Sequence, residues 1–206
     1  MQKMIAISQS NYISWKGYFD IIARADEFVI YDEAQFTKND WRNRNQIKTP
    51  LGLHWLTIPV HGSTSKKISD VVIADPGWRK THLKTIHQYY KEASCYEEIA
   101  PWVTELYKNA DFNLLSDVNV FFIKQINRFL GINTPIFPSS DFALKGSATQ
   151  KVVSICEELD ADVYLSGPTA KNYLDLSLFK RAGIKISWMD YSNYPEYSQV
   201  YGPFEH

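Results

Sequence analysis

Two short apolar runs near the N-terminus, Met4-Ile5-Ala6-Ile7 and Phe28-Val29-Ile30-Tyr31, decide the fold class. Each run is continuously apolar and ends in polar residues, which is typical of strands buried on both faces of a parallel sheet. Between them, the stretch from Trp15 to Ala25 carries its large apolar residues at helical spacing. A strand, a helix and a strand within about thirty residues predict the βαβ unit of a parallel sheet.

The same alternation continues along the chain. Strands are predicted at 54–60, 71–73, 136–137, 163–165 and 184–188, and helices at about 78–91, 96–109, 114–130, 149–159 and 177–182. The polar, basic stretch Ala34 to Pro50 is predicted to be a long connection, either functional or mobile, and Gly62 to Lys67 a flexible loop. We therefore expect one α/β domain over 1–206, with a mainly parallel Rossmann-like sheet, flanking helices and a helical insert at about 78–130.

Composition excludes several classes of protein. The 206 residues include 22 Lys and Arg against 23 Asp and Glu, which excludes a strongly basic nucleic-acid binder. No apolar run reaches the roughly 18 residues of a membrane span, and the N-terminal run is too short for a secretory signal, so a cytoplasmic location is expected. Cys95 and Cys156 lack metal-site spacing and are expected to be buried reduced thiols, and no metal site is predicted.

The first candidate segment is Ser8-Gln9-Ser10-Asn11-Tyr12, directly after the first predicted strand. Ligands in open α/β sheets bind at the carboxyl ends of the strands, and a helix that follows offers free N–H groups. Gln9, Asn11 and Tyr12 are therefore candidates for substrate binding. The alternative is that these polar residues only cap the helix.

The second candidate segment follows the second predicted strand. Asp32 and Gln35 come first, and the basic run Trp41 to Lys48 follows. Guanidinium and amide groups at this density suit a bidentate clamp on phosphate or carboxylate, and an indole adds a stacking surface. The alternative is a solvated charged face. The candidate residues of the run are Trp41, Arg42, Arg44, Asn45 and Lys48.

The third candidate segment begins at Ser166-Gly167, after a later strand, where a small turn lets the backbone approach a ligand. Lys171 would neutralise a negative group there, although a simple strand-to-helix turn explains the pattern equally well. Of the histidines, His82 is the acid–base candidate, with a purely structural role as the alternative.

Taken together, these segments resemble the WbqC-like family over nearly the whole chain. The blocks that carry the resemblance are Gln9–Tyr12, Gly17-Tyr18, Asp32–Phe36, Trp41–Pro50, Trp55–Val60, Tyr164–Gly167, Tyr173–Asp175 and Tyr197–Gln199. Ser10 and Ser14 stand where the family usually has proline. The resemblance implies an enzyme of O-antigen or other surface-polysaccharide synthesis that transfers glycine or another acyl group to a nucleotide-linked or lipid-linked sugar.

The residues suggest roles in such a reaction, which would form an amide on an amino sugar. Arg42, Arg44 and Lys48 would hold phosphate or carboxylate groups and stabilise developing negative charge. Gln9, Tyr12 and Asn45 would orient the substrate. Asp32 is the candidate base or metal ligand, and His82 is the reserve acid–base group. A homo-oligomer is left open.

A more distant likeness is to the nucleotidylyltransferase superfamily, such as pantothenate synthetase. It is carried by Ile7-Ser8, Gly17-Tyr18, Arg24-Ala25-Asp26, Phe28–Ile30 and Gln35-Phe36. Those enzymes activate a carboxylate with ATP, so ATP is the cofactor that this likeness implies. Gln9 and Tyr18 stand near the positions of that family's His pair, so the likeness implies a shared fold more than a shared reaction. The rival hypothesis is a non-catalytic module that binds a nucleotide sugar or a partner enzyme.

Overall fold

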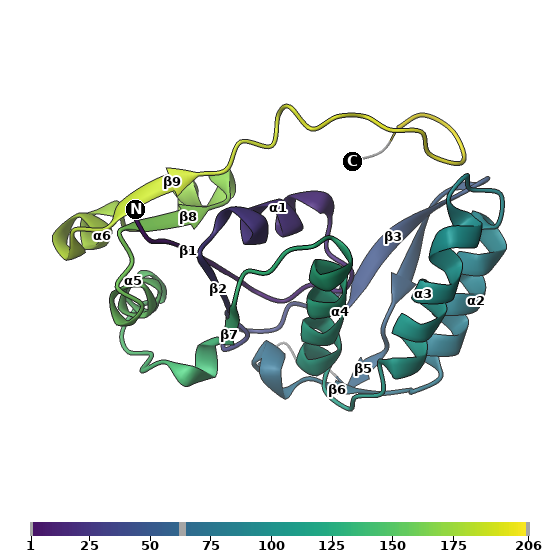
Figure 1. The fold of residues 1–206 in the computed structure, drawn as a ribbon. Coiled ribbons are helices and arrows are strands. Elements are labelled where there is room, and N and C mark those ends of the chain that lie inside the picture. Colours follow the sequence, from purple (N-terminus) through teal and green to yellow (C-terminus); the bar gives the residue numbers. More distant parts are fainter. Residues whose placement is uncertain (1, 62–64, 205–206) are drawn as a thin grey trace. The chain divides into compact units, whose positions relative to one another are not determined.

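The computed structural model describes residues 2–61 and 65–204 (Figure 1). The chain divides into two compact units. Unit 1 comprises residues 1–9, 15–33 and 127–194, and unit 2 comprises residues 10–14, 34–126 and 195–206. Neither unit is continuous in the sequence. The expectation of one domain with a helical insert stays a prediction.

Unit 1 contains a five-stranded, all-parallel sheet. Its order is β7 (Ile136–Pro138), β2 (Glu27–Ile30), β1 (Met4–Ser8), β8 (Val163–Ser166) and β9 (Lys185–Trp188). The helices of this unit are α1 (Lys16–Arg24), α5 (Ala148–Glu158) and α6 (Leu176–Ala182), with 3₁₀ turns η2 (Ser139–Asp141) and η3 (Pro168–Asn172). The α/β, Rossmann-like fold predicted from the sequence is confirmed, as is the N-terminal βαβ unit.

The local sequence explains these elements. Ile5, Val29 and Tyr164 are at most 4% exposed, because the central strands are covered on both faces. Helix α5 begins at a capping box, in which the Ser147 and Gln150 side chains bond reciprocally to the backbone. Helix α6 is capped by Asp175 and ends at Gly183, which takes φ 74°.

Unit 2 combines a β-hairpin with helices. The hairpin is β3 (Arg44–Thr49) paired with β4 (Gly52–Thr57), and a shorter pair joins β5 (Val60–His61) to β6 (Val72–Ile73). The 3₁₀ turn η1 (Ile68–Asp70) precedes α2 (Trp78–Tyr90), α3 (Tyr96–Asn109) and α4 (Leu115–Phe129), whose last three residues belong to unit 1. The three helices predicted between about 78 and 130 are present.

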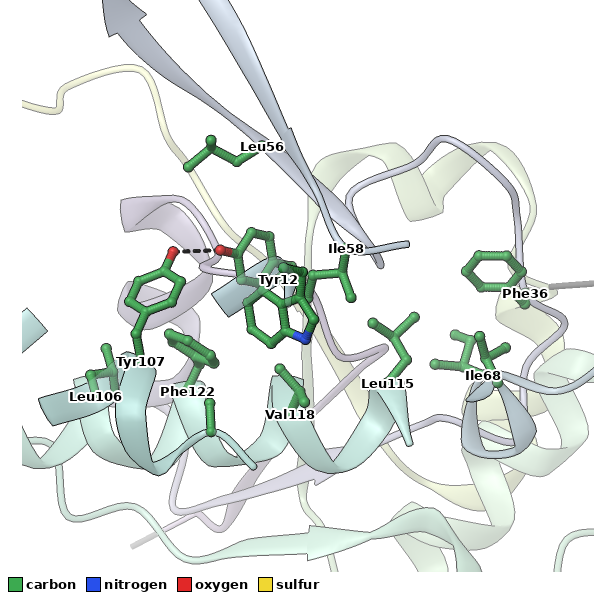
Figure 2. Close-up of a cluster of buried hydrophobic side chains, with 13 residues drawn as sticks. Tyr12, Phe36, Leu56, Ile58, Ile68, Leu106, Tyr107, Leu115, Val118 and Phe122 are labelled. Atoms are coloured by element: carbon green, nitrogen blue, oxygen red, sulfur yellow. Dashed lines mark hydrogen bonds between the residues drawn. The ribbon is translucent and has the colours of Figure 1, made fainter. Parts of the chain in front are cut away.

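The core of unit 2 is aromatic and has Tyr12 near its centre (Figure 2). The Tyr12 ring packs edge-on against Trp78 and Phe122, with ring centroids 5.9 and 5.6 Å apart. Edge-to-face pairs at this spacing are stabilising beyond their buried area. Aromatic residues make up 15% of the chain, and many of them therefore serve as core.

Three local predictions were wrong. The stretch Ala34 to Pro50 is not a connection throughout, because β3 lies inside it and pairs with β4. The single strand predicted at 54–60 is two strands, separated at Pro59, which has no N–H to donate to a ladder. Cys95 is exposed, whereas Cys156 is buried as predicted, and both thiols are free. Residues 62–64 of the predicted flexible loop lie outside the described residues.

Candidate functional site

The topological switch point of the unit 1 sheet lies between β1 and β8. From β1 the chain moves outward to β2 and β7, and later it returns to β8 on the other side of β1. In open parallel sheets, ligands bind outside the carboxyl ends of the strands at such a point. Gln9 directly follows β1. Ser166 is the last residue of β8, and Gly167 follows it. The register, in which Ala6 lies opposite Leu165, brings these two candidate segments to the same sheet edge.

The backbone at this edge is held in place. The Tyr18 hydroxyl donates to the Gln9 carbonyl oxygen at 3.0 Å, and the Tyr31 N–H donates to the Ser8 carbonyl at 2.8 Å. Asp32, which follows β2, is 5% exposed. Ser166 is buried, whereas Lys171 is exposed and its ammonium lies 5.3 Å from the Trp188 ring centroid. The edge is therefore a fixed framework of β-strand ends.

Sequence reasoning missed an aromatic cluster of unit 1. The Trp15 ring, 43% exposed at the start of α1, lies 4.9 Å from the Tyr191 ring and 6.1 Å from the Tyr194 ring. A Cβ placed on Gly167 would lie 3.6 Å from the Tyr191 hydroxyl, so Tyr191 stands beside the end of β8. The only sequence signal was the surplus of aromatic residues, because Tyr191 and Tyr194 belong to no periodic element.

In unit 2, Arg42 binds the turn that carries Asn11. Its Nη1 lies 3.3 Å from Asn11 Oδ1 and 3.4 Å from Asp40 Oδ2. Partial burial opposes ionisation of Asp40, but hydrogen bonds from Thr37 and the Trp41 N–H, together with the arginine charges, outweigh it and lower the Asp40 pKa. Arg42 is thus already paired with an ionised carboxylate.

Arg44 is placed differently, because an indole holds it. Its guanidinium lies 4.0 Å from the centroid of Trp55, and Trp55 packs on Trp41 at 5.5 Å. Trp41 and Trp55 are 47% and 37% exposed. Within the described part of the chain, Arg44 makes no salt bridge, and its Nε is buried without a hydrogen-bond partner. Arg44 therefore makes no salt bridge, although its charge helps to lower the Asp40 pKa, and it lies beside an exposed aromatic pair, of which Trp55 was not a sequence candidate.

Lys48 binds the C-terminal segment of unit 2. Its ammonium donates to Gln199 Oε1 at 3.0 Å and to the Pro203 carbonyl oxygen. Its backbone N–H donates to the Tyr90 hydroxyl at 3.1 Å, and the Tyr201 hydroxyl donates to the Tyr89 carbonyl at 2.7 Å. The side chain predicted to hold an anion thus has protein oxygens as its partners in this structure.

Two predicted substrate-binding residues stabilise the fold. Tyr12 is fully buried, so the structure places it in the core of unit 2 and away from any solvent-accessible substrate. Asn45 donates from Nδ2 to the carbonyl oxygens of Tyr12 and Ile13, while its Oδ1 accepts the N–H of Gln46 at 2.7 Å. Asn45 thereby ties β3 to the turn at residues 12–13.

His82 belongs to the same buried network. Its Nε2 lies 3.1 Å from the Thr57 carbonyl oxygen, which can only accept, so Nε2 carries the proton. Nδ1 then accepts from the Tyr12 hydroxyl at 2.8 Å, and the Tyr107 hydroxyl donates to Tyr12. Burial lowers the pKa of His82 to about 4. With both ring nitrogens bonded, His82 has no free atom for acid–base chemistry in this state.

The remaining candidate, Gln35, is exposed in unit 2 and forms a β-bridge with Lys67. Among the described residues, no group of three or more His, Cys, Asp and Glu side chains is arranged to hold a metal ion. None of the helices described has the length and apolarity needed to cross a bilayer.

Comparisons with known proteins place the chain in a family. A family model described as "WbqC-like protein family" matches residues 9–206. An uncharacterized protein of Mycobacterium tuberculosis, Rv1507c, is 42% identical over 205 residues, which cover 98% of this chain and 89% of the relative. No solved structure matches. The match over nearly the whole chain shows that this protein belongs to the WbqC-like family.

Proposed function

We propose that this protein is a transferase or ATP-dependent ligase of O-antigen or other surface-polysaccharide synthesis. It forms an amide, with glycine or another acyl group, on an amino sugar that is carried by a nucleotide or a lipid. ATP and nucleotide-linked sugars are cytoplasmic compounds, so the proposed location is the cytoplasm. The observation that carries the proposal is the switch point of the unit 1 sheet, where Gln9 and Ser166-Gly167 meet at one edge.

The charge distribution supports an anionic substrate. Arg44 makes no salt bridge with any of the residues described, and an exposed aromatic pair lies beside it. A guanidinium in this state binds phosphate or carboxylate without first breaking an ion pair. Arg44 is the proposed anion-binding residue of unit 2. In unit 1, Gln9 and the backbone at Gly167 are the proposed substrate contacts at the sheet edge.

A specific observation favours the rival function, a non-catalytic module that binds a nucleotide sugar. His82, the one acid–base candidate among the histidines, is buried with both nitrogens bonded. A binding module needs no proton-transfer group. The same candidate residues would serve it in each unit.

A two-stage experiment separates these functions. First, thermal shift is measured with ATP, nucleotide sugars and glycine, singly and combined. Ligands that stabilise the fold then enter an assay for AMP or pyrophosphate release, with mass spectrometry for the amide. Product formation supports the enzyme, and stabilisation without product from any combination supports the module. If no ligand of the panel raises Tm or reacts, the proposal fails.

Variants connect the result to the proposed site. Arg44→Ala should abolish turnover or ligand stabilisation while leaving the Tm of the free protein nearly unchanged, since a cation–π contact of a half-buried arginine with a partly exposed indole contributes only about 0.5–1 kcal/mol. Arg181→Ala, on α6, is the matched control, because Arg181 bonds only to the nearby Ser177 hydroxyl among the hydrogen bonds described. Collapse of the fold in Arg44→Ala would instead make Arg44 a structural residue.

A further inference from the structure

Gly167, the residue after β8, is a glycine that the fold itself does not require. Its φ of −68° and ψ of 151° describe extended backbone that any residue adopts. Apart from its chain neighbours, a Cβ built on Gly167 would meet only the Tyr191 hydroxyl, at an ordinary contact distance of 3.6 Å. Alanine would therefore fit the protein without strain. The missing side chain leaves space at the carboxyl end of β8, where ligands of open parallel sheets bind.

Polar side chains with unused hydrogen-bonding capacity flank Gly167. Gln9 directly follows β1, and Tyr191 comes shortly after β9. Because β8 lies between β1 and β9 in the sheet, these two residues stand on either side of Gly167. Both are half-buried, and within the described part of the chain neither the Gln9 amide nor the Tyr191 hydroxyl makes a hydrogen bond. Half-buried polar groups without a protein partner are available to bind a ligand.

An indole stands beside Tyr191 and is fixed in place. The centroids of the Trp15 and Tyr191 rings are 4.9 Å apart, and Trp15 is 43% exposed. A Cβ built on Gly17 would overlap the Trp15 ring, so the indole lies directly against the first turn of α1. The exposed ring is therefore positioned before a ligand arrives, which lowers the entropy lost on binding.

The charged groups near these rings are paired or shielded. Asp20 accepts from Arg24 Nε at 2.8 Å and from the Tyr194 hydroxyl at 2.6 Å. The Lys16 ammonium lies 5.2 Å from the Tyr194 ring centroid and is shielded from solvent. What the cluster offers a ligand is consequently neutral: an amide, an indole and a phenol. Such groups suit an uncharged ligand that carries both hydrogen-bonding and apolar surface.

We propose that this edge of unit 1 is a sugar-binding site that holds one pyranose ring. Its residues are Gln9, Trp15, Gly167 and Tyr191. The hydroxyls of a sugar both donate and accept, as the amide and the phenol do. The C–H groups of a pyranose face are weakly positive and are attracted by the negative face of an indole. At Gly167 the absent side chain lets the sugar approach the backbone.

This inference rests on the proposed function, because it assigns the sugar part of the proposed substrate to this edge. The full chain is studied by saturation-transfer NMR with glucosamine, galactosamine, their N-acetyl derivatives and, for comparison, uridine. Saturation is expected on the ring C–H protons of at least one of the sugars. Titration of that sugar then gives its dissociation constant for the wild type and the variants.

The variants remove one contact each. Gly167→Ala should weaken sugar binding by about tenfold or more, because the added methyl group occupies the space of the sugar. Tyr191→Phe should weaken it by about two- to tenfold through the lost hydrogen bond. Trp15→Ala should weaken it by a similar about two- to tenfold through the lost aromatic face.

The matched control is Tyr89→Phe. Tyr89 is half-buried on α2 of unit 2, and its hydroxyl likewise makes no hydrogen bond to the residues described. This variant should bind the sugar like the wild type. Gly167→Ala and Tyr191→Phe introduce no clash and break no described hydrogen bond, so a urea melt should show unchanged folding for both.

Several outcomes would overturn the proposal. One is that no sugar of the panel receives saturation, and another is that uridine alone does, which would make this edge a nucleobase site. A third is that Gly167→Ala and Tyr191→Phe bind the sugar as tightly as the wild type. Binding is measured without turnover, and amide formation is assayed separately. Sugar binding without product would therefore support this site and refute the enzyme, whereas product formation unaffected by these variants would do the reverse.

Discussion

Acidification should weaken the folded protein through one buried imidazole. His82 is 4% exposed, and burial lowers its pKa from 6.5 to about 4. Between these two pKa values, the His82 imidazole is protonated in the unfolded chain and neutral in the folded chain. Stability therefore rises with pH across this window: the contribution of neutral His82 is complete above the unfolded pKa and is lost as pH falls toward the folded one.

The size of the effect follows from the two pKa values. At about pH 5 the linkage relation gives a loss of roughly 2 kcal/mol relative to about pH 7, and the full shift of about 2.5 units corresponds to roughly 3.4 kcal/mol. A domain whose total stability is about 5–15 kcal/mol would show this loss clearly. The structural reason is that protonation puts a hydrogen on Nδ1, the atom that accepts from the Tyr12 hydroxyl.

The assay is urea denaturation of the wild type and of His82→Gln at about pH 5 and about pH 7, monitored by tryptophan fluorescence. Carboxylates titrate equally in both proteins, so only the wild type should show the additional loss of roughly 2 kcal/mol. Comparing each protein with itself removes any constant cost of the substitution. Equal losses in both proteins would refute the assignment of His82 as a neutral buried base.

Further substitutions at Asn45, Gly183 and Gly17 test other contacts in the fold. Asn45→Ala should destabilise the protein by about 1–3 kcal/mol in a urea melt, and Asn45→Asp by a comparable amount. Either change removes the amide donor that binds the carbonyl oxygens of Tyr12 and Ile13. Unchanged stability would show that these hydrogen bonds are dispensable. Gly183→Ala should cost about 1–2 kcal/mol in the same assay, since an alanine at φ 74° is strained, and an unchanged midpoint would contradict that. Gly17→Ala places a Cβ 2.3 Å from the Trp15 ring, so near-ultraviolet circular dichroism should change while stability moves by less than about 1 kcal/mol; an identical spectrum would mean that Trp15 does not pack as described.

The parallel sheet was predictable because each of its central strands can be recognised from its own short sequence. Runs such as Phe28–Ile30 are buried on both faces and read as continuous apolar segments. The β3 strand gave no such signal. Its sequence, Arg-Asn-Gln-Ile-Lys-Thr, has one aliphatic residue, because one face is solvent-directed and the other includes Asn45, which bonds to backbone carbonyls. Such a strand is defined by its partner rather than by its own composition.

Some candidate site residues were predictable from the sequence and others were not, for a similar reason. Gln9 and Ser166-Gly167 were predictable as one edge, since position after a parallel strand determines where a residue lies. Tyr12 was not, because its polar neighbours suggested a surface turn while its ring enters an aromatic core. For Lys48, the partners Gln199 and Pro203 lie about 150 positions later in the sequence, a separation of 151 for Gln199 that no local pattern reveals.

The five residues 10–14 interrupt unit 1 and belong to unit 2, and Tyr12 among them fills the centre of its core. Neither unit can consequently be transferred to another protein as one continuous segment. Residues 34–126 expressed alone would lack the Tyr12 ring, around which their aromatic side chains pack. A deletion series that trims the N-terminus past Tyr12 should therefore produce insoluble fragments instead of a smaller working module. A single recombination breakpoint anywhere between residues 7 and 179 would divide the core of unit 1, because its buried residues run from Ile5 to Ile184.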